Sequence, residues 1–222
     1  MSISRKFSRE SDPIILIDVN EVRKKNPCKL ASALIESPYF KTIVKDADAC
    51  RAYLGLEQYE PWGDYIVLFP PGNPVHPDGA MIGIERKTTV DAFGRILDGT
   101  MNEQLSELIG KTHGKAILLH EKSDYVPANI VRGIHKNKTK GRVSKAEQAS
   151  ALRRIRTAVS TKFNKLDFAV VRWEIENIDQ CLRHFADLCE FGWNYEIEGR
   201  GYRVHRNGLR IGIKKIPVKP KV

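Results

Sequence analysis

Short apolar runs alternate with segments of helical period along most of the chain, and this alternation limits the possible folds more than any other feature of the sequence. Five runs have the length and the β-branched content of buried strands. They are Pro13–Glu21, Gly63–Phe69, Ala80–Lys87, Lys115–Glu121 and Asp167–Glu174. This order of elements predicts an α/β protein, with a central mixed sheet flanked by helices.

The helical segments have recognisable ends. A helix over Cys28–Ser37 should stop before Pro38, because the residue before a proline avoids helical geometry. Thr88 or Thr89 can cap one long helix that runs through Val90–Gly110, where Gly110 is a plausible stop. Further helices are expected at Asp46–Leu56, Ala146–Phe163 and Asn177–Gly192.

Two of the strand-like runs, Gly63–Phe69 and Ala80–Lys87, are joined by the Pro/Gly-rich loop "PPGNPVHPDG" and predict a long hairpin. Asp64 stands at the start of the first strand, and Glu85 and Lys87 stand near the end of the second. Because side chains alternate along a strand, Glu85 and Lys87 share one of its faces. The hairpin can therefore bring Asp64 close to Glu85.

Carboxylates that converge at this point would have a definite chemistry. Two of them form a hard oxygen site of the kind that Mg²⁺ or Mn²⁺ prefers. Lys87 could orient an attacking water or neutralise charge on a phosphate. Asp18 and Glu21 could add ligands for a second ion, about 3.5–4 Å from the first. A solvated strand end is the alternative, because an acid-x-Lys triplet alone is common.

Positive charge is concentrated in two parts of the chain, whose net charge is +10. Residues 132–165 hold eleven Lys or Arg and one acid, Glu147, whereas residues 200–222 hold eight Lys or Arg and no acid. Such clusters suit DNA, because neutralised phosphates release condensed counterions; a solubilising loop and tail is the alternative. The DNA-contacting residues expected from charge are Arg132, Lys136, Lys138, Lys140, Arg142, Arg153, Arg154 and Arg156.

The stretch "GDY…IERKTTVD" resembles the GD-x(n)-ERK-x(3)-D signature of the XPF/Hef-type structure-specific endonucleases, a branch of the restriction-endonuclease-like fold. Gly99 and Gln104 occupy the positions of a Gly and a Gln that follow the signature in that family. The resemblance covers about Pro13–Glu190 and implies a restriction-endonuclease-like sheet. The resemblance does not include the tandem helix-hairpin-helix domain that usually follows in the family, so a stand-alone nuclease domain is expected.

The resemblance also implies residue roles. Asp64 and Glu85 would be the main metal ligands, with the main-chain carbonyl of Arg86 beside them. Lys87 would be the catalytic lysine, and Asp91 would support the site. The side chain of Arg86 would point away from the metal and form a structural ion pair, for example with Asp91.

Further residues follow from the same family pattern. Glu21 and Asp18 would be outer or second-metal ligands for Mg²⁺, which Mn²⁺ should replace, and Gln104 would contact DNA. Two positions depart from the pattern: Asn20 and Thr100 both stand where the family has Arg. Arg95, on the same helix as Thr100, is expected to compensate for the second.

These observations favour a metal-dependent endonuclease that cuts branched DNA in repair, recombination or replication. The alternatives are a Holliday-junction resolvase, a restriction-type endonuclease of the same fold, or a non-cleaving DNA-binding subunit that partners an active nuclease. The family implies a homodimer or heterodimer through the nuclease domain. A stripe on the last helix could serve this pairing: Ile178, Cys181, Leu182, Phe185, Leu188 and Cys189.

The expected organisation is a flexible N-terminus (1–12), a nuclease domain (13–191) with a basic insertion (124–150), and a basic, β-rich C-terminal extension (192–222). The four cysteines lack zinc-site spacing and suit a reduced intracellular protein. His113, His120 and His135 share no helical spacing and are interpreted as ordinary histidines. The N-terminus has no apolar core of a signal peptide, so neither secretion nor membrane contact is expected.

Overall fold

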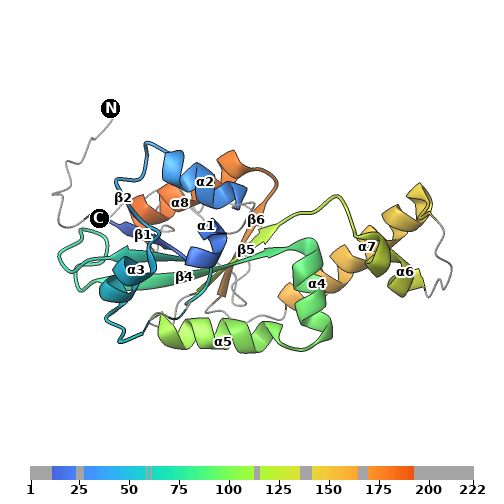
Figure 1. The fold of residues 1–222 in the computed structure, drawn as a ribbon, viewed down its shortest axis with the longest axis horizontal. Coiled ribbons are helices and arrows are strands. Elements are labelled where there is room, and N and C mark those ends of the chain that lie inside the picture. The colour runs from blue at the N-terminus through green and yellow to red at the C-terminus, as the bar shows by residue number, and fades with distance from the viewer. Residues whose placement is uncertain are drawn as a thin grey trace, which may run out of the picture.

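The structure is a computed structural model that describes residues 12–23, 28–58, 60, 62–112, 116–135, 142–164 and 170–192. Within these residues six strands form one mixed sheet, in the order β2-β1-β3-β4-β5-β6 (Figure 1). The strands are β1 (Ile14–Ile17), β2 (Thr42–Val44), β3 (Tyr65–Phe69), β4 (Ala80–Thr88), β5 (Ala116–Glu121) and β6 (Val170–Ile175). The predicted α/β class with a mixed central sheet is confirmed.

Helices cover both faces of the sheet (Figure 1). They are α1 (Val19–Arg23), α2 (Lys29–Glu36), α3 (Ala47–Leu54), α4 (Thr89–Leu97), α5 (Met101–Lys111), α6 (Ala128–His135), α7 (Lys145–Phe163) and α8 (Ile178–Phe191). One apolar cluster joins α2 and α8 to one face, and a second joins α4, α5, α6 and α7 to the other. The two faces of the sheet are therefore buried by different helix groups.

The centre of the sheet is the predicted hairpin. β3 pairs antiparallel with β4, with Tyr65 opposite Ile84, which puts the preceding Asp64 next to Glu85. β4, β5 and β6 are parallel to one another, so their carboxyl ends lie along a single edge. Lys87 comes at this edge, directly beside His120 of β5.

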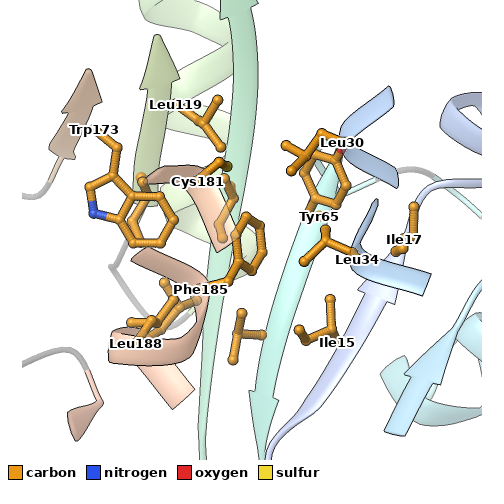
Figure 2. Close-up of a cluster of buried hydrophobic side chains, with 14 of the residues drawn as sticks. Ile15, Ile17, Leu30, Leu34, Tyr65, Leu119, Trp173, Cys181, Phe185 and Leu188 are labelled. Atoms are coloured by element: carbon orange, nitrogen blue, oxygen red, sulfur yellow. The ribbon is translucent and has the colours of Figure 1, made fainter. Parts of the chain in front are cut away.

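Figure 2 shows the cluster under α2 and α8, where large rings fill the core. The ring of Phe185 meets those of Tyr65 and Trp173 edge to face, at centroid distances of 5.6 and 5.5 Å. Cys181 and Leu188 are fully buried beside them. Most of the apolar stripe of α8 thus packs on its own sheet, and the predicted pairing through it stays a prediction.

Several elements differ from the sequence-based expectation: β2, α1 and α6 were not predicted, and two predicted elements have other bounds. The first strand ends at Ile17; Asp18 lies in the turn that leads into α1 and accepts a hydrogen bond from Asn20 N at 2.6 Å, whereas Glu21 lies within α1. The single helix expected over residues 90–110 is two helices, because the chain turns at Gly99, whose φ of 80° is left-handed. Gly110 does not stop α5, which ends at Lys111.

Other predicted boundaries hold or fall outside the described residues. Thr88 caps α4 by accepting a hydrogen bond from Asp91 N, and α2 ends before Ser37 as expected. The expected insertion at 124–150 contains α6 and the first turns of α7. The expected flexible N-terminus and basic extension lie almost wholly outside the described residues. In the described part of the chain, no helix has the length and apolarity needed to span a membrane.

Candidate active site

The start of β3 and the end of β1 are fixed to each other beside the hairpin. Asp18 N donates a hydrogen bond to Asp64 O at 3.0 Å, so two acidic residues lie side by side where their strands meet. Gly63, just before Asp64, has a φ of 104°, and a Cβ there would come within 3.1 Å of Leu108 Cδ1 and 3.2 Å of Ile84 O. Only glycine suits this position without strain, which explains the Gly-Asp pair.

These acids line a cleft of about 370 Å³ between the sheet end and α5. Four carboxylates predicted from the sequence contribute to its wall: Asp18, Glu21, Asp64 and Glu85. The opposite wall comes from α5 and includes Gln104, which was predicted as a DNA contact. The structure therefore brings all four predicted metal-ligand residues, and Gln104, to a single cleft.

Asp64 is a strongly perturbed acid of this cleft. Its Oδ2 accepts a hydrogen bond from Arg86 N at 2.6 Å. Burial raises the pKa of Asp64 to about 7, helped by the negative charges of Glu85 and Glu21, while the Arg86 N–H and Lys87 act in the opposite direction. The cleft thus holds more negative charge than its own groups neutralise, and a cation bound there would be favoured.

Lys87 and Glu85 lie on the same face of β4, as strand alternation predicts. Their side chains form an ion pair and are only 11% and 14% exposed. Lys87 therefore neutralises one of the two central carboxylates in the absence of other cations. A metal ion that binds Glu85 would displace Lys87 from this ion pair. The ammonium group of Lys87 could then contact a substrate.

Arg86 points to the other face of the sheet, as predicted, but its partner is not Asp91. The guanidinium pairs with Glu121 of β5 and lies 3.9 Å from Glu21 Oε2. Asp91 instead accepts a hydrogen bond from the Thr88 hydroxyl at 2.7 Å, in the first turn of α4. The helix starts directly after the strand and turns Asp91 away from Arg86, so Asp91 organises the cap of α4.

The donor set of the cleft can be compared with the needs of Mg²⁺. No three His, Cys, Asp or Glu side chains of the described residues are grouped so as to hold a metal ion. Mg²⁺ does not need such a cage, because it commonly takes one or two carboxylates and completes its shell with water and phosphate oxygens. The raised pKa of Asp64 beside Glu85 and the oxygen-rich lining of the cleft fit this kind of site.

The predicted DNA-contacting arginines lie away from the cleft. Arg153, Arg154 and Arg156 are exposed on α7, which extends with α6 beyond the sheet (Figure 1). Arg132 is half-buried on α6, and Arg142 is exposed just before α7. The other three predicted lysines, Lys136, Lys138 and Lys140, lie outside the described residues.

Some residues of the site were not anticipated. Glu107 and Lys111 line the cleft from α5 and pair with each other at 2.8 Å. The spacing of Gln104, Glu107 and Lys111 puts all three on one face of the helix. This polar face was the sequence feature from which Glu107 and Lys111 could have been predicted. The Arg86 partner Glu121 carried no such signal, because the pairing joins two separate strands. Arg95 donates a hydrogen bond from Nη1 to Thr100 Oγ1 at 3.3 Å, and its compensation for the missing arginine stays a prediction.

No protein-family model matches the sequence, and no curated protein matches it either. Among solved structures the chain is similar to XPF from Aeropyrum pernix, with 17% sequence identity and a TM-score of 0.38, over 81% of this chain. It spans 66% of that protein's chain, slightly less than two thirds. At this level of similarity nothing about activity follows, and the function has to be inferred from the residues of the cleft.

Proposed function

We propose that this protein is a metal-dependent endonuclease that hydrolyses phosphodiester bonds in branched DNA, such as flaps, forks or junctions. The observation that supports this most is the meeting of Asp64 and Glu85 in one cleft, with Lys87 paired to Glu85. Hard oxygen ligands next to a lysine are the groups that phosphodiester hydrolysis requires. DNA repair, recombination or replication would be its setting.

The four predicted acids of the cleft and the neighbouring Lys87 each have a role in this proposal. Asp64 and Glu85 would bind one Mg²⁺, which Mn²⁺ can replace, with the main-chain carbonyl of Arg86 as a further donor. The bound ion would supply an activated water and neutralise charge on the scissile phosphate. Lys87 would hold the attacking water or a phosphate oxygen in position. Glu21 and Asp18 would interact with the ion through water.

The basic residues would position the DNA. Arg153, Arg154 and Arg156 are exposed on α7, Arg132 lies on α6, and Arg142 comes just before α7. Such side chains contact phosphates, whose positions depend on the shape of the DNA and not on its base sequence. A preference for branched geometry over a particular sequence is therefore expected.

Cleavage of end-labelled DNA tests the proposal. Flap, fork, four-way-junction and linear duplex substrates are incubated with Mg²⁺ or Mn²⁺ and the wild-type protein, Asp64→Ala, Lys87→Ala or Glu103→Gln. Glu103 is exposed on α5 and does not line the cleft, so its variant is a matched control beside Gln104. Cutting of the branched substrates alone, lost in Asp64→Ala and Lys87→Ala but kept in Glu103→Gln, is the expected result.

Other outcomes would point to other functions. Cutting of the four-way junction alone would indicate a resolvase, and cutting of linear duplex at fixed sequences would indicate a restriction-type enzyme. Salt-sensitive binding to branched DNA without cleavage under either metal would mean that the chain is a DNA-binding subunit. Absence of both binding and cleavage would refute the proposal.

A further inference from the structure

A second cavity, of about 500 Å³, lies on the same face of the sheet as the cleft. Its wall includes His120 and Glu174, which stand level with Lys87 in the parallel register of β4, β5 and β6. Neighbouring strands are roughly 4.7–4.9 Å apart, so the cavity begins one strand away from Lys87. Its volume lies within the range of roughly 300–1,000 Å³ that small-molecule sites occupy.

The charges that line this cavity cancel. Three basic and three acidic side chains contribute to it, and every basic one is paired with an acidic one. The pairs are Lys122–Glu176 at 2.8 Å, Arg156–Asp124 at 2.7 Å, and Arg172–Glu174. A phosphate entering such a cavity would meet as much negative as positive charge, so the lining favours a neutral polar ligand.

The inner wall of the cavity is fixed by an aromatic ring. The fully buried Phe163 lies edge to face with the imidazole of His120, at a centroid distance of 5.1 Å. The guanidinium carbon of Arg172 lies 5.2 Å from the centre of the same ring. Arg172 Nη1 is buried and makes no hydrogen bond within the described residues, whereas His120 Nδ1 lies 3.9 Å from Glu174 Oε1. This wall thus offers flat groups together with one unused guanidinium nitrogen.

An open groove of different character leads into the cavity along α7. Arg156 and Ser160 line both spaces, so the two adjoin at these residues. The groove adds Arg153, Thr157 and Thr161, and no acidic side chain of the described residues lines it. Hydroxyl and guanidinium donors of this kind suit a phosphate backbone.

We propose that the cavity receives one unpaired base of the DNA strand, while the α7 groove holds the phosphates that precede it. A neutral heterocycle with donors and acceptors on its edge matches the cavity, and a chain of phosphates matches the groove. The base would be taken out of the stack one strand away from Lys87, which would couple recognition of a branch point to the cutting site. This inference rests on the proposed function.

An abasic scan of a DNA fork tests the inference. Each nucleotide around the branch point is replaced in turn by an abasic spacer, and binding is measured with Ca²⁺ in place of Mg²⁺ to avoid cleavage. Loss of one stacked base should weaken binding about tenfold at one position and little elsewhere. Ser160→Phe fills the mouth of the cavity, and Thr161→Phe places the same ring in the groove alone. Both positions are exposed on α7, so neither change disturbs the core.

We expect a single sensitive position with the wild-type protein and with Thr161→Phe, and a flat profile with Ser160→Phe. Tight binding with a flat profile in the wild-type protein, or a sensitive position that survives in Ser160→Phe, would overturn the inference and leave the proposed nuclease intact. Failure to bind any DNA would overturn the proposed function, and the inference with it.

Discussion

The close packing of α5 on β4 leads to a sharp prediction for Gly83→Ala. A Cβ at Gly83 would lie 2.3 Å from Leu108 Cδ1, 2.7 Å from Leu108 Cγ and 3.0 Å from Thr112 Cγ2. Carbon atoms in contact stand about 3.5–4.0 Å apart, so either Leu108 or the whole helix has to move by about 1 Å. Overpacking of this kind costs about 1–3 kcal/mol of the free energy of unfolding.

The assay is thermal unfolding together with DNA cleavage. For a chain of this length each kcal/mol corresponds to a change of about 2–4 °C in Tm, so Gly83→Ala should lower Tm by several degrees. Cleavage should fall too, because the displaced helix carries Gln104 and Lys111 of the cleft. Gly94→Ala is the control: a Cβ at this exposed α4 position has nothing within 4 Å, and alanine should raise stability by up to about 1 kcal/mol.

A double-mutant cycle separates the proposed clash from a general weakness of the strand. Leu108→Ala alone should cost about 2–5 kcal/mol, because it leaves a cavity under α5. The added methyl group of Gly83→Ala fits into that cavity, so the double variant should be no less stable than Leu108→Ala alone. Additive losses, or a Gly83→Ala protein as stable as the wild type, would refute the reasoning.

Three further predictions concern separate parts of the molecule. The interaction with His120, followed by the charges of Arg172 and Lys122, lowers the pKa of Glu174 from 4.5 to about 2. Ionised Glu174 therefore stabilises the fold above pH 4.5, and this stabilisation is lost as the pH falls toward 2. Glu174 is 40% exposed and is screened by solvent, so Glu174→Gln should lower the free energy of unfolding by about 1 kcal/mol at pH 7. This loss should shrink below pH 4.5. An equal loss at pH 7 and pH 3 in urea titrations would contradict the prediction. Ser144 forms a complete capping box with Glu147 at the start of α7. Ser144→Ala should lower the free energy of unfolding by about 1 kcal/mol in the same urea titration at pH 7. An unchanged midpoint would show that the cap contributes nothing. Mg²⁺ at 100 times its Kd should stabilise the wild type by about 2.7 kcal/mol in a thermal-shift assay, and an equal effect on Asp64→Ala would place the ion elsewhere.

The central hairpin and its acids were predictable because they depend on local rules. Alternation along β4 is enough to put Glu85 and Lys87 on one face, and a hairpin brings Asp64 beside them. The break at Gly99 was missed because apolar residues keep a helical period on both sides of it. The Arg86–Glu121 pair was missed because nothing local specifies which strand lies next to β4.

The second cavity shows the same limit more clearly. His120 and Glu174 had no distinguishing pattern in the sequence, since each comes at the end of an apolar run, and the local partner of Glu174, Arg172 at strand spacing, forms a common kind of strand pair. Their relation to Lys87 exists only in the parallel register of three strands. Sequence patterns therefore locate the groups that a single hairpin brings together, but not the groups that distant crossovers bring together.

The position of Asp64 and Glu85 on the two arms of one hairpin also affects the order of folding. Isolated hairpins form within about 1–10 μs, and chains fold from the N-terminus during synthesis, so this pair can meet before β5 and β6 have been made. The walls of the cleft that come from α5, and the whole second cavity, can only form afterwards. The growing chain would therefore possess the two carboxylates proposed to bind the metal before it possesses the surfaces proposed to hold DNA.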